Sequence, residues 1–113
     1  RIGTDSSNDA FNASERNVIS GNTNSSAVIH GITVTGAASS GSVIAGNYIG
    51  VTPNGSSALL NQYFGISVEG SANNVRIGAN GDGLNEEGER NVVSGNGNTA
   101  IAIGSSNNVI RGN

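Results

Sequence analysis

The sequence predicts an all-β solenoid, and two recurring phrases together with abundant glycine and asparagine predict it. The first phrase has the form Asn-Val-Ile-x-Gly-Asn, and variants of it occupy residues 17–22, 42–47, 74–78, 91–96 and 108–113. The second has the form Gly-Ile-x-Val-x-Gly and lies between copies of the first, at residues 31–36, 65–70 and 100–104. Short β-type phrases that recur at the spacing of a coil are typical of solenoids, in which each unit buries its apolar face against its neighbours.

Alternation within the second phrase predicts the inner wall. Successive strand residues face opposite sides of the backbone, so every second residue of each copy shares a face. The inward set is Ile32, Val34, Ile66, Val68, Ile101 and Ile103. Strands stacked in register about 4.8 Å apart would place Ile32, Ile66 and Ile101 in one column, with the other three in the next. Thr33, Ser67 and Ala102 would then face solvent.

The first phrase contributes a second set of inward residues. Its third position is apolar in four of the copies, at Ile19, Ile44, Val93 and Ile110. At Arg76 the pattern slips by one residue, so that Ile77 and Val75 take the interior. The position after the inward residue varies from Ser20 and Ser94 to Ala45 and Arg111, which is typical of a solvent-facing position.

Glycine and asparagine predict the corners between strands. Glycine adopts positive φ without penalty, and asparagine tolerates the same region and can bond its own backbone. Asparagines stacked at one corner can also bond one another along the axis, which predicts ladders at Asn22, Asn47, Asn96 and Asn113. The alternative is that these are ordinary hairpin turns of a β-sandwich, because short alternating strands with turn signals serve both architectures.

In chain order, the phrases predict about three strands per coil and roughly three coils. A half-coil at 17–20 precedes a coil with strands near 31–35, 42–46 and 48–52. The next coil has strands near 65–69, 74–78 and 91–94, and another half-coil runs from residue 100 onward. Residues 4–15, 53–63 and 79–90 are expected as loops that project from the stack, with Ala58-Leu59-Leu60 forming one turn over an edge of the inner wall.

Both phrases, together with residues 48–55 (Tyr-Ile-Gly-Val-Thr-Pro-Asn-Gly) and 89–96 (Glu-Arg-Asn-Val-Val-Ser-Gly-Asn), resemble the repeats of right-handed parallel β-helix proteins. Such repeats belong to the pectin-lyase-like superfamily and occur in large bacterial surface and secreted proteins. The resemblance covers nearly the whole chain and implies an open-ended right-handed parallel β-helix. It does not specify a function, because that superfamily holds lyases, hydrolases, epimerases, tailspikes, adhesins and structural solenoids.

Composition excludes several classes of partner. The 113 residues carry a formal net charge of −3 and contain no cysteine, no methionine and no lysine. A chain with so little basic charge is a poor ligand for nucleic acid. It also lacks an apolar run long enough to span a bilayer. Neither Arg1-Ile2-Gly3-Thr4 nor Gly112-Asn113 looks like a capping unit, so residues 1–113 are expected to form one segment of a longer solenoid or a unit that stacks end to end with copies of itself.

One loop has the composition of a calcium site. Residues 80–89 alternate oxygen-bearing side chains with glycines, and calcium prefers six to eight oxygen ligands on a flexible backbone. The candidate ligands are Asn80, Asp82, Asn85 and Glu86. The loop lacks the full spacing of an EF-hand or of the glycine-rich nonapeptide, and a solvated acidic turn explains the same residues.

Few residues are suited to catalysis. Glu69 is the one acidic residue within a strand phrase, and His30 precedes Gly31 as in the His-Gly pair of polygalacturonases, but the aspartate motifs of those enzymes are missing. Arg16 and Arg90 recur at equivalent loop-to-strand junctions, which indicates that they bridge coils or bond loop carbonyls rather than anchor an acidic sugar.

Two functions remain. The first is a non-catalytic structural β-solenoid of an extracellular or cell-surface filament, stalk or adhesin shaft, with no cofactor except calcium at the acidic loop. The second is a carbohydrate-binding or shaft segment of a polysaccharide-active enzyme whose catalytic coils lie outside this chain. A groove lined by Tyr48, Tyr63 and Phe64 would favour the second.

Overall fold

In the computed structural model, which describes residues 1–7 and 14–113, the chain is all-β and builds three parallel sheets. The first sheet has the order β1 (Ile2–Gly3), β4 (Val43–Ala45), β7 (Arg76–Gly78) and β10 (Val109–Arg111). The second has the order β2 (Val18–Ile19), β5 (Tyr48–Ile49) and β8 (Val92–Val93), and the third has the order β3 (Ile32–Thr35), β6 (Ile66–Glu69) and β9 (Ile101–Ile103). One short 3₁₀ helix, η1 (Ala37–Ser39), follows β3.

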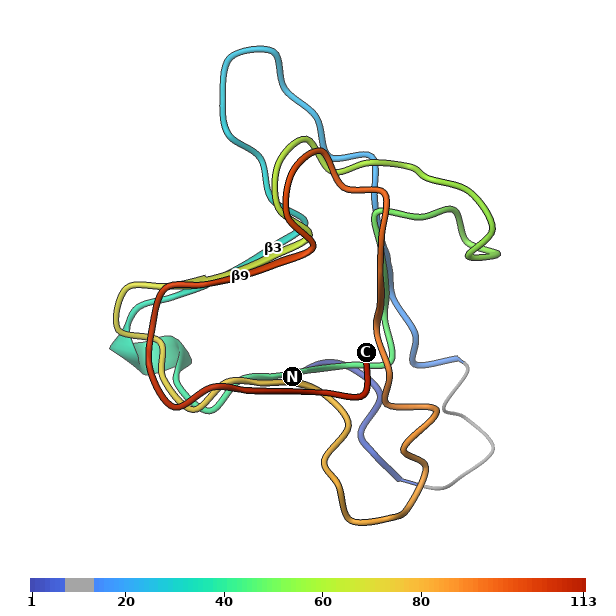
Figure 1. Ribbon diagram of the computed structural model, residues 1–113, viewed down its shortest axis with the longest axis vertical. Coiled ribbons are helices and arrows are strands. Elements are labelled where there is room, and N and C mark those ends of the chain that lie inside the picture. The colour runs from blue at the N-terminus through green and yellow to red at the C-terminus, as the bar shows by residue number, and fades with distance from the viewer. Residues whose placement is uncertain (8–13) are drawn as a thin grey trace.

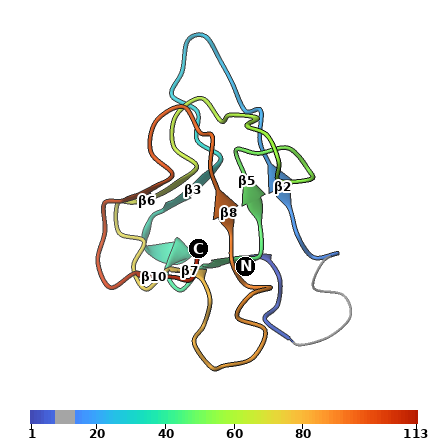
Figure 2. The ribbon, with the colours of Figure 1, turned by 45° about the vertical axis from the view of Figure 1, so that its right-hand side comes forward.

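The chain visits the three sheets in strict rotation. Each strand is followed in sequence by a strand of the next sheet, and it pairs with strands about one turn of the chain away. Seen down the shortest axis, the sheets form three sides of an open triangle, and longer loops leave its corners (Figure 1). After a rotation, β2, β5 and β8 are seen side by side (Figure 2). All pairings among the described strands are parallel, so these strands are not joined to one another as hairpins of a β-sandwich.

The predicted column at the inner wall is confirmed by the register. Ile32 is aligned with Ile66, and Ile66 with Ile101. In the first sheet, Ile44 is aligned with Ile77, so the slip predicted at Arg76 also holds. The buried core consists of Ile32, Val34, Ile44, Ile49, Ile66, Val68, Ala72, Val75 and Ile77. Aliphatic side chains from all three sheets therefore meet in one core between them.

Burial decreases toward both ends of the stack. Ile103 and Ile110, expected in the inner wall, are 37% and 50% exposed, and Ile19, Val93 and Ile101 are only partly buried. The reason is that β2, β8, β9 and β10 each have a strand on one side only among the described residues. Conversely, Ser67 and Ala45 were expected in solvent and are buried, because each lies in a strand with neighbours on both sides.

The loop after β5 differs from the expected turn. Ala58 forms an antiparallel bridge with Val51, and the N–H of Leu59 donates to the carbonyl of Gly50 over 2.8 Å. Residues 58–59 are thus extended along the end of β5 rather than turned over the inner wall. The loop returns to the stack at Asn61, which is buried, so it is shorter than the expected 53–63. Of the expected loop 4–15, residues 8–13 lie outside the described residues.

The corner between the first and second sheets alternates from coil to coil. Long segments join β1 to β2 and β7 to β8, whereas only Gly46 and Asn47 separate β4 from β5. The two long segments have similar ends, Arg-Ile-Gly at 1–3 and 76–78 and Glu-Arg-Asn at 15–17 and 89–91. The coil without a loop therefore lies between two coils that carry one.

Candidate functional site

A ladder of asparagine side chains occupies the corner between the first and second sheets. The Nδ2 atoms of Asn17, Asn47 and Asn91 donate to Oδ1 of the next asparagine in the ladder, over 3.0, 3.0 and 2.8 Å, and the ladder ends at Asn113. Backbone N–H groups of the same residues donate to the same oxygens over 3.0 to 3.3 Å. Asn47 and Asn91 are buried. These amides thus join all four levels of the first sheet.

The ladder also binds strand carbonyls. Nδ2 of Asn47 donates to the carbonyls of Ile2 and Ala45, both over 3.0 Å, and Nδ2 of Asn91 donates to that of Ile44 over 2.9 Å. Backbone carbonyls at the corner thus accept hydrogen bonds from the asparagine amides. Because unpaired buried backbone groups are costly, these bonds are what allows the chain to turn so sharply inside the core.

A second ladder lies at the corner where the chain leaves the second sheet. Asn22 donates through Nδ2 to Oδ1 of Asn61 over 2.8 Å, and Asn61 donates to Oδ1 of Asn96 over 2.9 Å. The predicted set of Asn22, Asn47, Asn96 and Asn113 is thus divided between two corners. The sequence pattern missed Asn17, Asn61 and Asn91. Its signal for two of them is that asparagine begins the phrases at 17 and 91 as well as ending them.

Glu89 is the buried charge at the loop-bearing corner. Its side chain is fully buried, Oε1 lies 3.4 Å from Nη1 of Arg76, and Oε2 accepts from the N–H of Asn80 over 2.7 Å. Nη2 of Arg76 donates in turn to Oγ of Ser6 over 3.1 Å, and Nδ2 of Asn85 donates to the carbonyl of Ser7 over 3.0 Å. The two loops of this corner are therefore tied together across the intervening coil.

The loop between β1 and β2 and the loop between β7 and β8 are anchored by the same kind of hydrogen bond, from a backbone N–H to a glutamate. Oε2 of Glu15 accepts from the N–H of Asp5 over 2.9 Å, as Oε2 of Glu89 does from the N–H of Asn80. Between them, Gly46 donates its N–H to the carbonyl of Glu89 over 2.9 Å. A Cβ at Gly46 would lie 2.8 Å from the Gly88 carbonyl oxygen and 2.9 Å from Cγ2 of Thr4. The two loops thus cover the corner between β4 and β5, where the intervening coil has no loop of its own.

Three of the four residues proposed as calcium ligands hold turns within their own loop. Oδ1 of Asn80 accepts from the N–H of Asp82 over 2.9 Å, and Oδ1 of Asp82 accepts from the N–H of Leu84 over 2.7 Å. Oε1 of Glu86 accepts from the N–H of Gly83 over 2.9 Å, and Asn85 donates its amide to the other loop. This arrangement is that of a capped acidic turn, whose oxygens already accept from backbone N–H groups.

Asp5 holds a similar turn in the other loop. Hydrogen bonds from Ser7, through its side chain and its backbone N–H, keep the pKa of Asp5 below its ordinary value, and the charge of Arg1 adds to this. The backbone bond, from the Ser7 N–H to Oδ1 of Asp5, measures 2.7 Å. The turn therefore favours the ionised form of Asp5.

Tyr48 has different neighbours from Tyr63 and Phe64, the other two residues expected to line a groove. Cζ of Arg16 lies 4.3 Å from the centre of the Tyr48 ring, above its face, and the same ring packs against Gly55. Tyr63 and Phe64 contact each other and His30, whose ring stacks on Phe64 with centroids 4.9 Å apart. Nδ1 of His30 accepts from the N–H of Phe64 over 3.3 Å. His30 therefore connects two coils, and Arg16 connects its coil to the next through Tyr48.

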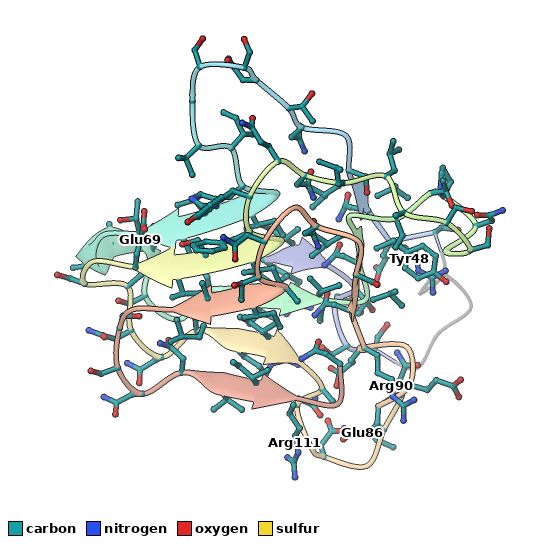
Figure 3. All side chains as sticks on the ribbon, turned by 45° about the horizontal axis from the view of Figure 1, so that its top comes forward. Tyr48, Glu69, Glu86, Arg90 and Arg111 are labelled. Carbon is teal, nitrogen blue, oxygen red and sulfur yellow. The ribbon has the colours of Figure 1, made fainter. Side chains whose placement is uncertain are left out.

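Glu69 is exposed at the end of β6. Its Oε2 accepts from Oγ of Ser67 over 3.4 Å. Figure 3 shows it on the opposite side of the molecule from Glu86, Arg90 and Arg111. Two carboxyl groups that share one substrate must lie within several ångströms of each other, whereas Glu69 and Glu86 lie on opposite sides of the molecule.

The described residues form no pocket, and no group of three or more His, Cys, Asp or Glu side chains gathers among them in a way that could hold a metal ion. None of the helical structure in residues 1–7 and 14–113 has the length and hydropathy of a membrane span. Comparisons with protein families, with curated proteins and with solved structures found no match to this chain.

Proposed function

We propose that this chain is a segment of a right-handed parallel β-helix, a β-solenoid, that serves as a non-catalytic structural element of an extracellular or cell-surface filament, stalk or adhesin shaft. The proposal rests on one observation, the use of the buried polar groups. Within residues 1–7 and 14–113, six polar or charged residues are buried, namely Thr4, Asn47, Asn61, Ser67, Glu89 and Asn91. Hydrogen bonds of five of them, at the side chain or the backbone, connect one level of the stack to another or join a loop to it, and Ser67 lies in β6, aligned with Thr33 of β3 and Ala102 of β9.

This use of polar groups favours a mechanical role over a chemical one. Active sites contain polar side chains that converge on a cavity and ionisable groups that remain available to react with a substrate. Here the buried asparagine amides and the buried carboxylate of Glu89 form their hydrogen bonds at the corners of the coils. Such bonds resist separation of the coils along the axis, which is the property that a shaft requires.

The rotation of the chain through three sheets supports extension along that axis. A further coil would pair with β10, where Val109 and Ile110 are 51% and 50% exposed, in the way that β10 pairs with β7. Further coils of the same kind are therefore the partners that the proposal implies. The resemblance of the sequence phrases to pectin-lyase-like repeats agrees with this.

Electron microscopy of the native material, together with a screen for polysaccharide cleavage, tests the proposal. We expect rods or filaments whose diffraction has a repeat of about 4.8 Å along the long axis, because the strands stack in that direction. We also expect no release of reducing ends from neutral or acidic polysaccharides. Cleavage that is lost in Glu69→Gln or His30→Ala, with Thr33→Ala as the control, would contradict the structural role.

A further inference from the structure

Three asparagines of this chain precede glycine within the described residues, at positions 54, 80 and 96, and their surroundings differ. An asparagine followed by glycine can cyclise, because the unhindered glycine nitrogen attacks the side-chain amide. The reaction is favoured when the N–H of that glycine donates no hydrogen bond to another group. Which of the three pairs can react therefore depends on the hydrogen bonds of the folded chain.

Two of the glycine nitrogens are engaged. The N–H of Gly55 donates to the carbonyl of Thr52 over 2.8 Å, and that of Gly97 donates to the carbonyl of Asn61 over 2.9 Å. Asn96 is itself part of a ladder, with Oδ1 accepting from Asn61 over 2.9 Å. In both pairs the hydrogen bond of the glycine N–H must break in a local opening before the asparagine can react. The observed rate of cyclisation is therefore lowered in proportion to the small equilibrium constant for that opening.

The third pair is arranged for the reaction. The Gly81 N–H has no hydrogen-bond partner among the described residues, and Gly81 is exposed with φ +82°. The guanidinium of Arg111 lies against Gly81 and donates to the Asn80 carbonyl over 3.4 Å. A positive charge beside the attacking nitrogen stabilises the deprotonated amide through which attack proceeds.

Asp82 holds both ends of the Asn80 side-chain amide. Its N–H donates to Oδ1 of Asn80 over 2.9 Å, at the oxygen that becomes negative when the carbonyl carbon is attacked. Its Oδ2 accepts from Nδ2, the leaving nitrogen, over 2.8 Å. The amide is therefore fixed in position and polarised next to a free nucleophile.

We propose that Asn80 is a site of selective self-modification, at which the Asn80–Gly81 pair forms a succinimide and hydrolyses to aspartate or isoaspartate. The Gly81 nitrogen gives its proton to solvent and bonds to Cγ of Asn80. The bond from Cγ to Nδ2 breaks, and Nδ2 takes a proton from water and leaves as ammonia. Water then adds to one of the two ring carbonyls and opens the ring.

The product loosens the loop. An oxygen replaces the Nδ2 donor and faces Oδ2 of Asp82, so two carboxylates lie where one hydrogen bond was. Isoaspartate also inserts a backbone carbon next to the N–H that Glu89 binds. In a long-lived structural protein, the reaction would release this loop from its buried anchor with age.

Peptide mapping by mass spectrometry tests the proposal. The folded 113-residue chain is incubated at mildly alkaline pH and body temperature, and deamidation at Asn54, Asn80 and Asn96 is followed over time. We expect Asn80 to convert at least about tenfold faster than the other two, and all three to convert at similar rates in denaturant, where the protecting bonds are lost. Equal rates in the folded chain, or an Asn80 that converts more slowly than in denaturant, would overturn the proposal.

Two variants separate the contributions. In Arg111→Gln, Asn80 should convert at least about twofold more slowly while Asn54 and Asn96 keep their rates, because the charge next to Gly81 is removed. In Asn80→Gln, modification at position 80 should disappear, because the ring that would form is larger and less favourable. An unchanged Asn80 rate in Arg111→Gln would overturn the role of that charge.

Discussion

Nδ2 of Asn47 lies 3.0 Å from Oδ1 of Asn91, and both residues are buried at the same corner of successive coils. Two polar side chains at the edge of an aliphatic core are tolerated because each satisfies strand carbonyls that a corner would otherwise leave unpaired. The relationship makes the corner a structural element in its own right, and the core columns and the ladders can be tested separately.

Asn91→Asp should destabilise the fold by about 2–4 kcal/mol, because a buried carboxylate cannot donate to the carbonyl of Ile44 or to Oδ1 of Asn113. Asn98→Asp is the matched control. Asn98 is exposed and contacts Thr99, so its substitution should cost less than about 0.5 kcal/mol. Thermal melting measures both, and equal costs would show that the ladder contributes nothing.

Ile77→Ala and Ile110→Ala make the same chemical change at two aligned positions of neighbouring strands. Ile77 is fully buried and Ile110 is 50% exposed. We expect a loss of about 2–5 kcal/mol at Ile77 and less than about 1 kcal/mol at Ile110, measured by chemical denaturation. Losses of similar size would mean that β10 is covered in solution.

Gly46→Ala and Gly41→Ala separate packing from backbone strain. Both glycines have φ near +75°, at +74° and +75°, so alanine is strained by about 1–2 kcal/mol in either case. Space around Gly41 is open, whereas a Cβ at Gly46 meets the Gly88 carbonyl and Thr4. Gly46→Ala should therefore lower the melting temperature substantially more. Equal shifts would argue against closure of the corner by the flanking loops.

Glu89→Ala should cost about 2–4 kcal/mol, because it leaves the N–H of Asn80 unpaired and removes the partner of Arg76. Glu89→Gln keeps an acceptor and should restore part of the loss. Glu87→Ala, at an exposed position of the same loop, should be nearly silent. Hydrogen exchange across residues 79–90 should increase in Glu89→Ala alone, and no increase there would contradict the anchor.

Calcium should leave the melting temperature unchanged, because the oxygens of Asn80, Asp82 and Glu86 already accept from loop N–H groups. A ligand that binds only the folded state must raise the melting temperature as its concentration rises. Melting in a chelator and in millimolar calcium makes the comparison. A rise that Asp82→Ala removes would instead establish a calcium site at this loop.

The sequence by itself determined the strands and their register. Alternation in 32–35, 66–69 and 101–103 fixes which side chains point inward, since a slip of one residue would turn every isoleucine to solvent. Aligning the phrases therefore gives the pairing of Ile32 with Ile66 and Ile101 directly. The recurrence of Glu-Arg-Asn also marked equivalent corners, because each copy directly precedes a strand of the second sheet, β2 in one case and β8 in the other.

Only the tertiary structure decided what lies between the phrases. Asn47 and Asn96 both follow glycine, yet they belong to different ladders, because Asn47 alone leads directly into another strand. Glu89 resembles any loop carboxylate in the sequence, and it is buried because a second loop, distant in the chain, closes over it. Local patterns record the period of the chain, whereas burial depends on which coils are neighbours, and that is set only when the strands stack.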